Sequence, residues 1–275
     1  MQQFELGQGV FAWTHTSPRF GDSNVGLVVD SDGLTIIDTT ATPEHGRAVL
    51  GAIGELTARL ELPIKRVVLS SSRVVFSGGS NAFWPAAFYG TEATSEQLDA
   101  PANPGTFRRL LPHLAGSYGD DFATRPITHV VSEPAWLSGA AYGVPLPGEG
   151  PANLAVHVPG AGVVFAGALA TFGVTPLAFD GDPEAWAGSL AQLTELAGSI
   201  VPGHGPPGGP ADVDNQMAYL LACVEAGGQA SSLGSGPWDS WSDRRFDAVN
   251  VERAARLADG DRSVPRAMYE LLGLA

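Results

Sequence analysis

Three polar residues lie in glycine-rich turns, where their side chains could do chemistry. Arg73 lies in a loop of small residues, Ser70–Asn81, while Glu149 and His204 each follow a Pro-Gly pair. Histidine and glutamate often transfer protons in enzymes, and an arginine can hold an anionic substrate or a developing oxyanion. We therefore expect His204 and Glu149 to act as base and acid, with Arg73 as the group that binds an anion.

The same residue types also allow structural roles. His204 could instead bond the backbone of its own loop. Ser71, Ser72 and Ser77 are typical of loop residues that satisfy nearby backbone groups, and the sequence contains no Gly-x-Ser-x-Gly elbow that would favour a serine nucleophile. The polar residues therefore leave a catalytic and a structural interpretation open.

Hydrophobic periodicity and turn residues predict the elements that position these side chains. Ser31-Asp32-Gly33 indicates a hairpin, Thr42-Pro43-Glu44 indicates the start of a helix, and a continuous apolar strand follows Pro63. The expected elements in the first half are strands at 10–14, 24–30, 34–38 and 64–69 and a helix at 42–60. In the second half they are strands at 127–131, 154–158, 162–166 and 200–201 and helices at 183–196 and 214–226.

Five segments of the sequence resemble motifs of the metallo-β-lactamase-fold metallo-hydrolase superfamily. Gly33–Thr39 matches the family's Gly-x-x-x-Ile-Asp-Thr, and Ser70–Asn81 stands where the family has Thr-His-x-His-x-Asp-His-x-Gly-Gly-Asn. Pro147–Asn153 is similar to Pro-Gly-His-Thr-Pro-Gly-Asn, Phe165–Ala168 to Phe-x-Gly-Asp, and Pro202–Gly205 to Pro-Gly-His-Gly. The resemblance implies an α/β fold, the αββα sandwich, over residues 1–210. We expect residues 211–275 to form a helical extension packed on the same domain.

The resemblance also implies that almost every metal ligand of the family is replaced. By position, the substitutes are Ser71, Arg73, Val75, Phe76, Glu149 and Ala168, whereas His204 keeps the family's residue. Zinc needs three or four N, O or S ligands at about 2.0–2.3 Å. Arg73 would also place a fixed positive charge where the cation belongs. We therefore expect no metal at this site and no other cofactor.

The same resemblance indicates which residues would contact a substrate. His15 lies at the edge of an early strand that borders the cleft in this fold. Trp238 belongs to the C-terminal segment that covers the cleft in related hydrolases, where it could line a pocket for an apolar or aromatic ligand. Ser71 and Phe76, at former ligand positions, complete the expected substrate-binding set. Packing in the core remains the alternative for Trp238.

Charge and composition exclude several classes of partner. The formal net charge of −14 would repel nucleic acid and anionic membranes, and 44% hydrophobic residues with 16% charged ones are typical of a globular chain. A single cysteine, Cys223, excludes an internal disulfide. The N-terminus lacks the pattern of a signal peptide, so we expect a cytoplasmic protein with a small-molecule partner and no membrane or nucleic-acid partner. The sequence does not determine the oligomeric state.

Three functions are compatible with these observations. The first is a metal-independent enzyme that catalyses cyclisation, dehydration, isomerisation or ester cleavage on a small molecule, with Glu149 kept ionised and His204 kept neutral by Arg73. The second is a non-catalytic protein that binds a small molecule or a protein partner, because Val75 and Phe76 would fill the metal cavity. The third, a zinc hydrolase with other ligands, is disfavoured because the six histidines form no close pair.

Overall fold

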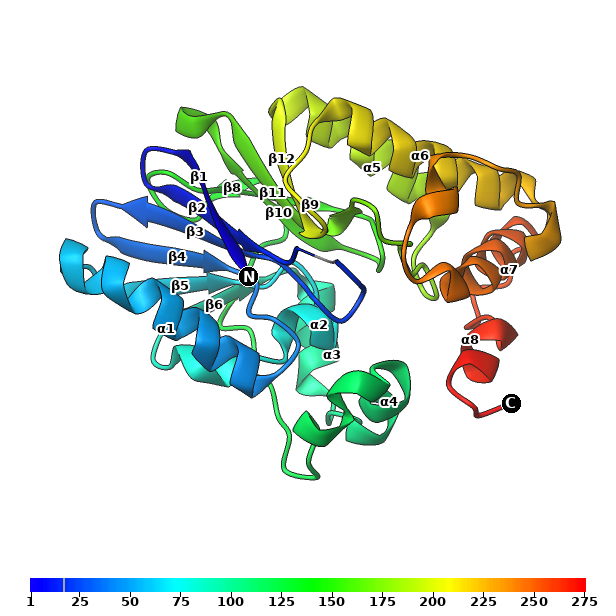
Figure 1. Cartoon of the computed structure of the whole chain (residues 1–275), viewed down its shortest axis with the longest axis horizontal. Helices are drawn as coiled ribbons and strands as arrows, with labels where there is room; N and C mark the ends of the chain where they lie inside the picture. The colour runs from blue at the N-terminus through cyan, green and yellow to red at the C-terminus, as the bar shows by residue number, and fades with distance from the viewer. Residues whose placement is uncertain (17) are drawn as a thin grey trace.

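The chain folds into two β-sheets that lie face to face between layers of helices (Figure 1). The structure is a computed structural model, and it describes residues 1–16 and 18–275. The arrangement is the αββα sandwich that the sequence predicts.

The first sheet has seven strands that follow one another in chain order. They are β1 (Gln2–Gly7), β2 (Val10–Thr14), β3 (Val25–Asp30), β4 (Gly33–Ile37), β5 (Ile64–Val68), β6 (Ala87–Gly90) and β7 (His129–Val130). Pairing is antiparallel from β1 to β4 and parallel from β4 to β7. Helix α1 (Pro43–Leu60) covers the outer face, where its Val49 and Ile53 pack against Leu27 and Ile36. The hydroxyl of Thr42 caps this helix by accepting from the backbone of His45 at 3.1 Å.

The second sheet has five strands and is covered by two long helices. In spatial order the strands are β12 (Ser199–His204), β11 (Val163–Thr171), β10 (Asn153–Val158), β9 (Tyr142–Leu146) and β8 (Ala135–Trp136). Helices α5 (Pro183–Leu196) and α6 (Pro210–Glu225) lie on its outer face, with Trp186 and Leu190 of α5 in one core with Val164 and Ile200 of the sheet. Strand β12 is parallel to β11, so its C-terminal end brings His204 to the same edge as the end of β11.

The two inner faces of the sheets form the central core. Val28, Ile37 and Val68 of the first sheet pack with Val156 and Phe165 of the second. Successive side chains of a strand point to opposite faces, so each inner strand serves both this core and the one beneath its helix. This double burial explains why the strands read as nearly continuous apolar runs in the sequence.

Several elements differ from those that the hydrophobic pattern predicts. The segment 70–81 contains helix α2 (Val74–Ser77) and a short 3₁₀ helix (Ser80–Phe83) rather than one loop leading into a helix. The strand expected at 127–131 is shorter, because β7 is an exposed edge strand with little apolar pattern. The pattern also gives no indication of β1, β6, β8, β9, helix α3 (Glu92–Asp99) or helix α4 (Pro104–Leu110).

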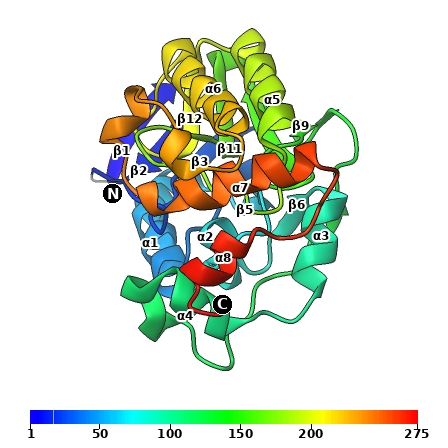
Figure 2. The same cartoon turned by 90° about the vertical axis from the view of Figure 1, so that its right-hand side faces the viewer.

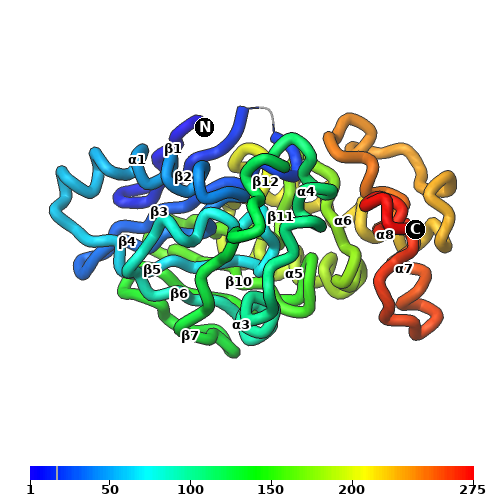
Figure 3. Tube along the Cα trace, turned by 90° about the horizontal axis from the view of Figure 1, so that it is seen from below, coloured from blue at the N-terminus to red at the C-terminus, as the bar shows by residue number. Residues whose placement is uncertain are grey.

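The C-terminal residues form helices α7 (Asp247–Ala258) and α8 (Arg266–Leu271) at one end of the molecule (Figures 2 and 3). Helix α7 contacts α5 and α6, and α8 packs near α4, where Arg109 donates to the backbone of Leu272 at 3.1 Å. Buried Asn250 of α7 donates to the carbonyl oxygen of Pro176 at 2.7 Å and accepts from the backbone N–H of Ala178 at 2.8 Å. Within the residues described, none of the helices has the length and apolarity needed to cross a membrane.

We expect Asn250→Ala to lower the free energy of unfolding by about 3 kcal/mol, because it leaves buried backbone groups of the 176–178 segment without a partner. Urea unfolding followed by circular dichroism should still show one transition, because the extension shares its core with the sandwich. The exposed Gln229→Ala serves as the control and should leave stability unchanged. A second, separate transition for the C-terminal helices would contradict the predicted single domain.

Candidate functional site

Arg73 immediately precedes helix α2 and is held by groups from two other loops. Its guanidinium forms an ion pair with Asp180, donates to the backbone oxygen of Glu149 at 3.3 Å, and lies 4.0 Å over the ring of Phe179. The Nε atom of Arg73 lies 3.7 Å from Oε1 of Glu149. The structure therefore brings Arg73 and Glu149 together, as the sequence predicts, and adds Asp180 and Phe179.

Glu149 is buried beside Arg73, with its carboxylate hydrogen-bonded by a serine. Only 4% of its surface is exposed, and Oε1 accepts from the hydroxyl of Ser71 at 2.5 Å. Burial raises the pKa of Glu149 to about 7, since the loss of hydration outweighs the opposing effects of Arg73 and Ser71. The expectation that Arg73 keeps Glu149 ionised is therefore wrong near neutral pH, where the protonated form is well populated.

His204 is buried between two aromatic rings. Its ring centroid lies 5.4 Å from that of Phe20 and 5.2 Å from that of Phe76. Nδ1 donates to the backbone oxygen of Asp22 at 3.2 Å, and buried Nε2 has no hydrogen-bond partner among the described residues. Burial lowers the pKa of His204 to about 4, so the ring is neutral near pH 7. The expected neutrality thus comes from burial rather than from Arg73.

Helix α2 packs apolar side chains into the core beside His204. Val75 and Phe76 are fully buried and pack in one core with Ala168. A Cβ atom placed on Gly203 would lie 2.6 Å from Cε1 of Phe76, so this ring lies directly against the turn that carries His204. The space next to His204 is therefore packed with side chains.

These residues do not fit the zinc ion that the fold family implies. His204 offers a buried Nε2 atom, but Arg73, Val75, Phe76 and Ala168 have no ligand atom to add, and a zinc site requires three or four. Across residues 1–16 and 18–275, no three His, Cys, Asp or Glu side chains are grouped in a way that could hold a metal ion.

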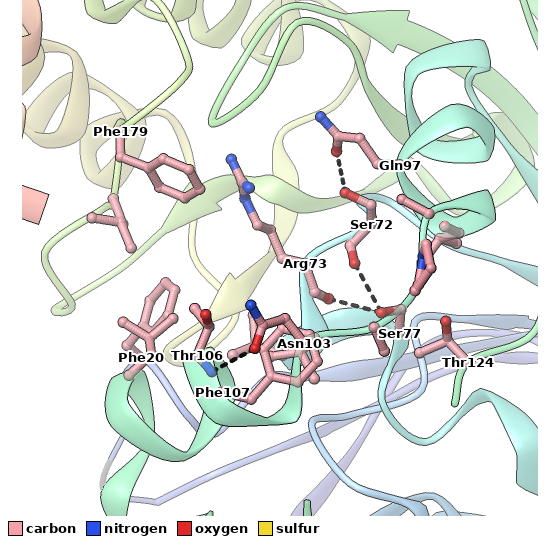
Figure 4. A pocket seen from close by; sticks show the side chains of 18 of the residues that line it. Phe20, Ser72, Arg73, Ser77, Gln97, Asn103, Thr106, Phe107, Thr124 and Phe179 are labelled. Carbon is pink, nitrogen blue, oxygen red and sulfur yellow. Dashed lines mark hydrogen bonds between the residues drawn. The ribbon is translucent and has the colours of Figure 1, made fainter. Parts of the chain in front are cut away.

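A cavity of about 290 Å³ opens beside α2 (Figure 4). Its walls come from α2, the segment that links α3 to α4, helix α4, the loop before α5, and α8. The apolar part includes Phe20, Val74, Phe107, Leu177, Phe179 and Met268, and the polar part includes Arg73, Ser72, Gln97, Asn103, Thr106 and Thr124. Neither Glu149 nor His204 is among the residues that line it.

The other expected ligand contacts lie away from this cavity. Trp238 is buried against Tyr219 in the core beneath α6, where its indole N–H donates to the backbone of Gly234 at 2.9 Å. Phe76 lies in the core, and the hydroxyl of Ser71 donates its hydrogen bond to Glu149. His15 is half-buried and does not line the cavity. The packing alternative thus describes the surroundings of Trp238, because the turn that carries it packs on α6, and within the C-terminal segment it is Met268 of α8 that lines the cavity.

Asp38 is a buried carboxyl group to which the sequence analysis assigned no role. It accepts from the backbone N–H of Ser70 at 2.8 Å and from the Ser70 hydroxyl at 2.7 Å, and that hydroxyl accepts from the backbone of Ala168 at 3.0 Å. Burial raises the pKa of Asp38 to about 7. Asp38 therefore joins the ends of β4 and β5 to β11. Asp38 lies in the motif Gly33–Thr39, so the sequence contained a signal that could have identified it as a site residue. Phe179 and Asp180 belong to no motif, and no such signal existed for them.

Comparison with solved structures finds proteins of one fold. The metallo-β-lactamase FIM-1 from Pseudomonas aeruginosa, in its mono-zinc form, matches with a TM-score of 0.60 and 20% identity over 80% of this chain and 94% of its own. A metallo-β-lactamase from Erythrobacter litoralis matches with a TM-score of 0.60 and 20% identity over 80% of this chain and 95% of its own. The sec-alkylsulfatase Pisa1 from Pseudomonas sp. has a TM-score of 0.68 and 18% identity, and the match covers 93% of this chain but 50% of Pisa1. No family model matches the chain, and neither does any curated protein. These matches establish the fold.

We expect the free energy of unfolding to fall by roughly 3 kcal/mol from pH 4.5 to above pH 7 on account of Glu149. A carboxyl group whose pKa is raised on folding stabilises the protein fully below its unfolded pKa of 4.5, and this contribution is lost as the pH rises through about 7. Urea unfolding at a series of pH values should show that the free energy of unfolding declines less with pH in Glu149→Gln than in the wild type. Part of the decline should remain in this variant, because the pKa of Asp38 is also raised to about 7. The exposed Glu133→Gln is the control, and identical pH profiles for the two variants would contradict the burial effect.

Proposed function

We propose that this chain, which has the metallo-β-lactamase fold, binds a small and mostly apolar molecule in the cavity beside Arg73, without a metal ion. The cavity itself is the observation that carries this proposal. Ligand pockets are concave and mostly apolar, with a few polar groups that orient the ligand. The cavity fits that description, because it combines apolar side chains with the polar group of Arg73. The apolar residues include Phe107, Leu177, Phe179 and Met268.

The residues around His204 support a function without metal. The P. aeruginosa neighbour has a mono-zinc form, whereas here the positions that resemble the family's ligands carry Ser71, Arg73, Val75 and Phe76. A metal-activated water needs an open coordination position. The rings of Phe76 and Phe20 pack against His204, so the environment of its imidazole is apolar.

Binding is a better account of the geometry than acid–base catalysis by His204 and Glu149. A general acid or base has to come within hydrogen-bond distance of the substrate. His204 is 1% exposed and Glu149 is 4% exposed, and neither lines the cavity. A ligand in the cavity would therefore meet Arg73 but not the two groups expected to move protons.

A metal-independent enzyme is the second candidate, favoured by one observation. Glu149 has a pKa near 7 and lies 3.7 Å from Arg73, which does line the cavity. Such a carboxyl group could donate a proton near neutral pH if Arg73 moved aside during cyclisation, dehydration, isomerisation or ester cleavage. Turnover that is lost in Glu149→Gln, with ligand binding retained, would favour this candidate.

We expect the protein purified without chelators to contain far less than one equivalent of zinc, iron or manganese. The reason is the shortage of ligand atoms around His204. Elemental analysis by mass spectrometry measures this directly, and His204→Ala serves as the matched variant. One tightly bound equivalent that disappears in His204→Ala would contradict the proposed metal-free function.

We expect 2-naphthamide, a neutral two-ring probe, to bind the wild-type protein and to lose at least tenfold in affinity in Thr106→Trp. Thr106 lines the cavity from helix α4, so an indole at this position would occupy the space that the probe needs. Isothermal titration calorimetry gives the affinities.

The control for this experiment is Ala48→Trp, which adds the same side chain at an exposed position of α1 outside the cavity. This variant should bind the probe as the wild type does. An unchanged affinity in Thr106→Trp, with folding verified by circular dichroism, would overturn the assignment of the cavity as the binding site.

A further inference from the structure

The positive charge in the cavity is already neutralised. Among the described residues that line the cavity, Arg73 is the one with a charged side chain. Its guanidinium is paired with Asp180, donates to the Glu149 backbone and stacks on Phe179. An anionic ligand in the cavity would therefore meet a charge that Asp180 already compensates.

Asp180 is held in its position by the C-terminal extension. Arg253 of α7 donates to the backbone oxygen of Asp180 at 3.0 Å and to that of Gly181 at 2.8 Å. Asn250, one helical turn earlier, holds Pro176 and Ala178 of the same loop. These hydrogen bonds fix the backbone of the 176–181 segment, and they therefore keep Asp180 next to Arg73.

The surrounding charge also disfavours an anion. Glu149 lies next to Arg73 and is ionised in part of the population near neutral pH, so the group formed by Arg73, Asp180 and Glu149 carries a net charge between zero and −1. The whole chain has a formal net charge of −14, which repels anions at long range.

The remaining polar groups of the cavity are uncharged and suit a neutral ligand. Gln97 and Asn103 contribute amides, and Thr106 and Thr124 contribute hydroxyls; Asn103 and Thr106 lie beside Phe107, whereas Gln97 lies beside Ser72 (Figure 4). An apolar cavity of about 150 Å³ accommodates one benzene ring. The cavity of about 290 Å³ is therefore of the size for a two-ring molecule.

We infer that the cavity selects an uncharged ligand of about two-ring size over the carboxylate of the same shape, because Asp180 already compensates the positive charge of Arg73. The inference rests on the proposed function and names the ligand class of that site. It also revises the role expected for Arg73, which here closes one wall of the cavity instead of holding an anionic substrate.

The test compares 2-naphthamide with 2-naphthoate, which are nearly isosteric and differ in charge at pH 7.5. Isothermal titration with the wild type should give an affinity for the amide at least about tenfold higher. In Asp180→Asn the freed guanidinium should tighten 2-naphthoate about tenfold or more and change 2-naphthamide less than about threefold. Circular dichroism and thermal unfolding check that the variant is folded. If it is not folded, the ratio of the wild-type affinities for 2-naphthamide and 2-naphthoate tests the inference.

The outcomes separate the inference from the function on which it rests. A wild type that binds 2-naphthoate as tightly as the amide or more tightly, with both lost in Thr106→Trp, would overturn the inference and leave the binding function standing. An Asp180→Asn variant that is folded but keeps the wild-type preference would overturn the role of Asp180. Binding of neither probe, or binding that Thr106→Trp does not affect, would overturn both.

Discussion

A close backbone contact between the loop after β4 and the end of α2 determines the geometry of the site. A Cβ atom on Gly78 would lie 2.0 Å from the carbonyl oxygen of Ala41, and one on Gly79 would lie 1.9 Å from that of Thr39. No residue with a side chain fits at these distances, so the two glycines allow α2 to lie against the first sheet. Arg73 immediately precedes α2, so the placement of this helix also places Arg73.

Once α2 is placed, its residues divide between two environments. Phe76 turns into the core and contacts His204, while Arg73, Val74 and Val75 line the cavity. Packing an aromatic ring next to His204 favours the neutral imidazole and removes space for water or a metal ion. The same short helix thus packs Phe76 into the core and forms part of the cavity wall.

The sequence predicted the framework better than the electrostatics. Strand β2 and helix α5 were predicted with the bounds that the structure has, because their apolar periodicity and their turn residues are local features. The pairing of Arg73 with Glu149 followed from the resemblance to a known fold. The partner Asp180 and the raised pKa of Glu149 could not be predicted, since both depend on how deeply the assembled loops bury these groups. Trp238 was expected near the ligand because the C-terminal segment covers the cleft in related hydrolases. Its position in the core could not be predicted, since the path of that segment is not encoded in any local pattern.

We propose that side chains occupy the space beside His204 and that a ligand binds in the cavity lined by Arg73 and Phe107. The most direct measurement is a crystal structure of protein grown with excess zinc and 2-naphthamide, with anomalous data collected at the zinc edge. The account predicts Phe76 packed against His204, no anomalous peak there, and density for the probe between Phe107 and Phe179. A zinc peak bonded to Nε2 of His204, with Phe76 displaced and the cavity empty, would contradict it.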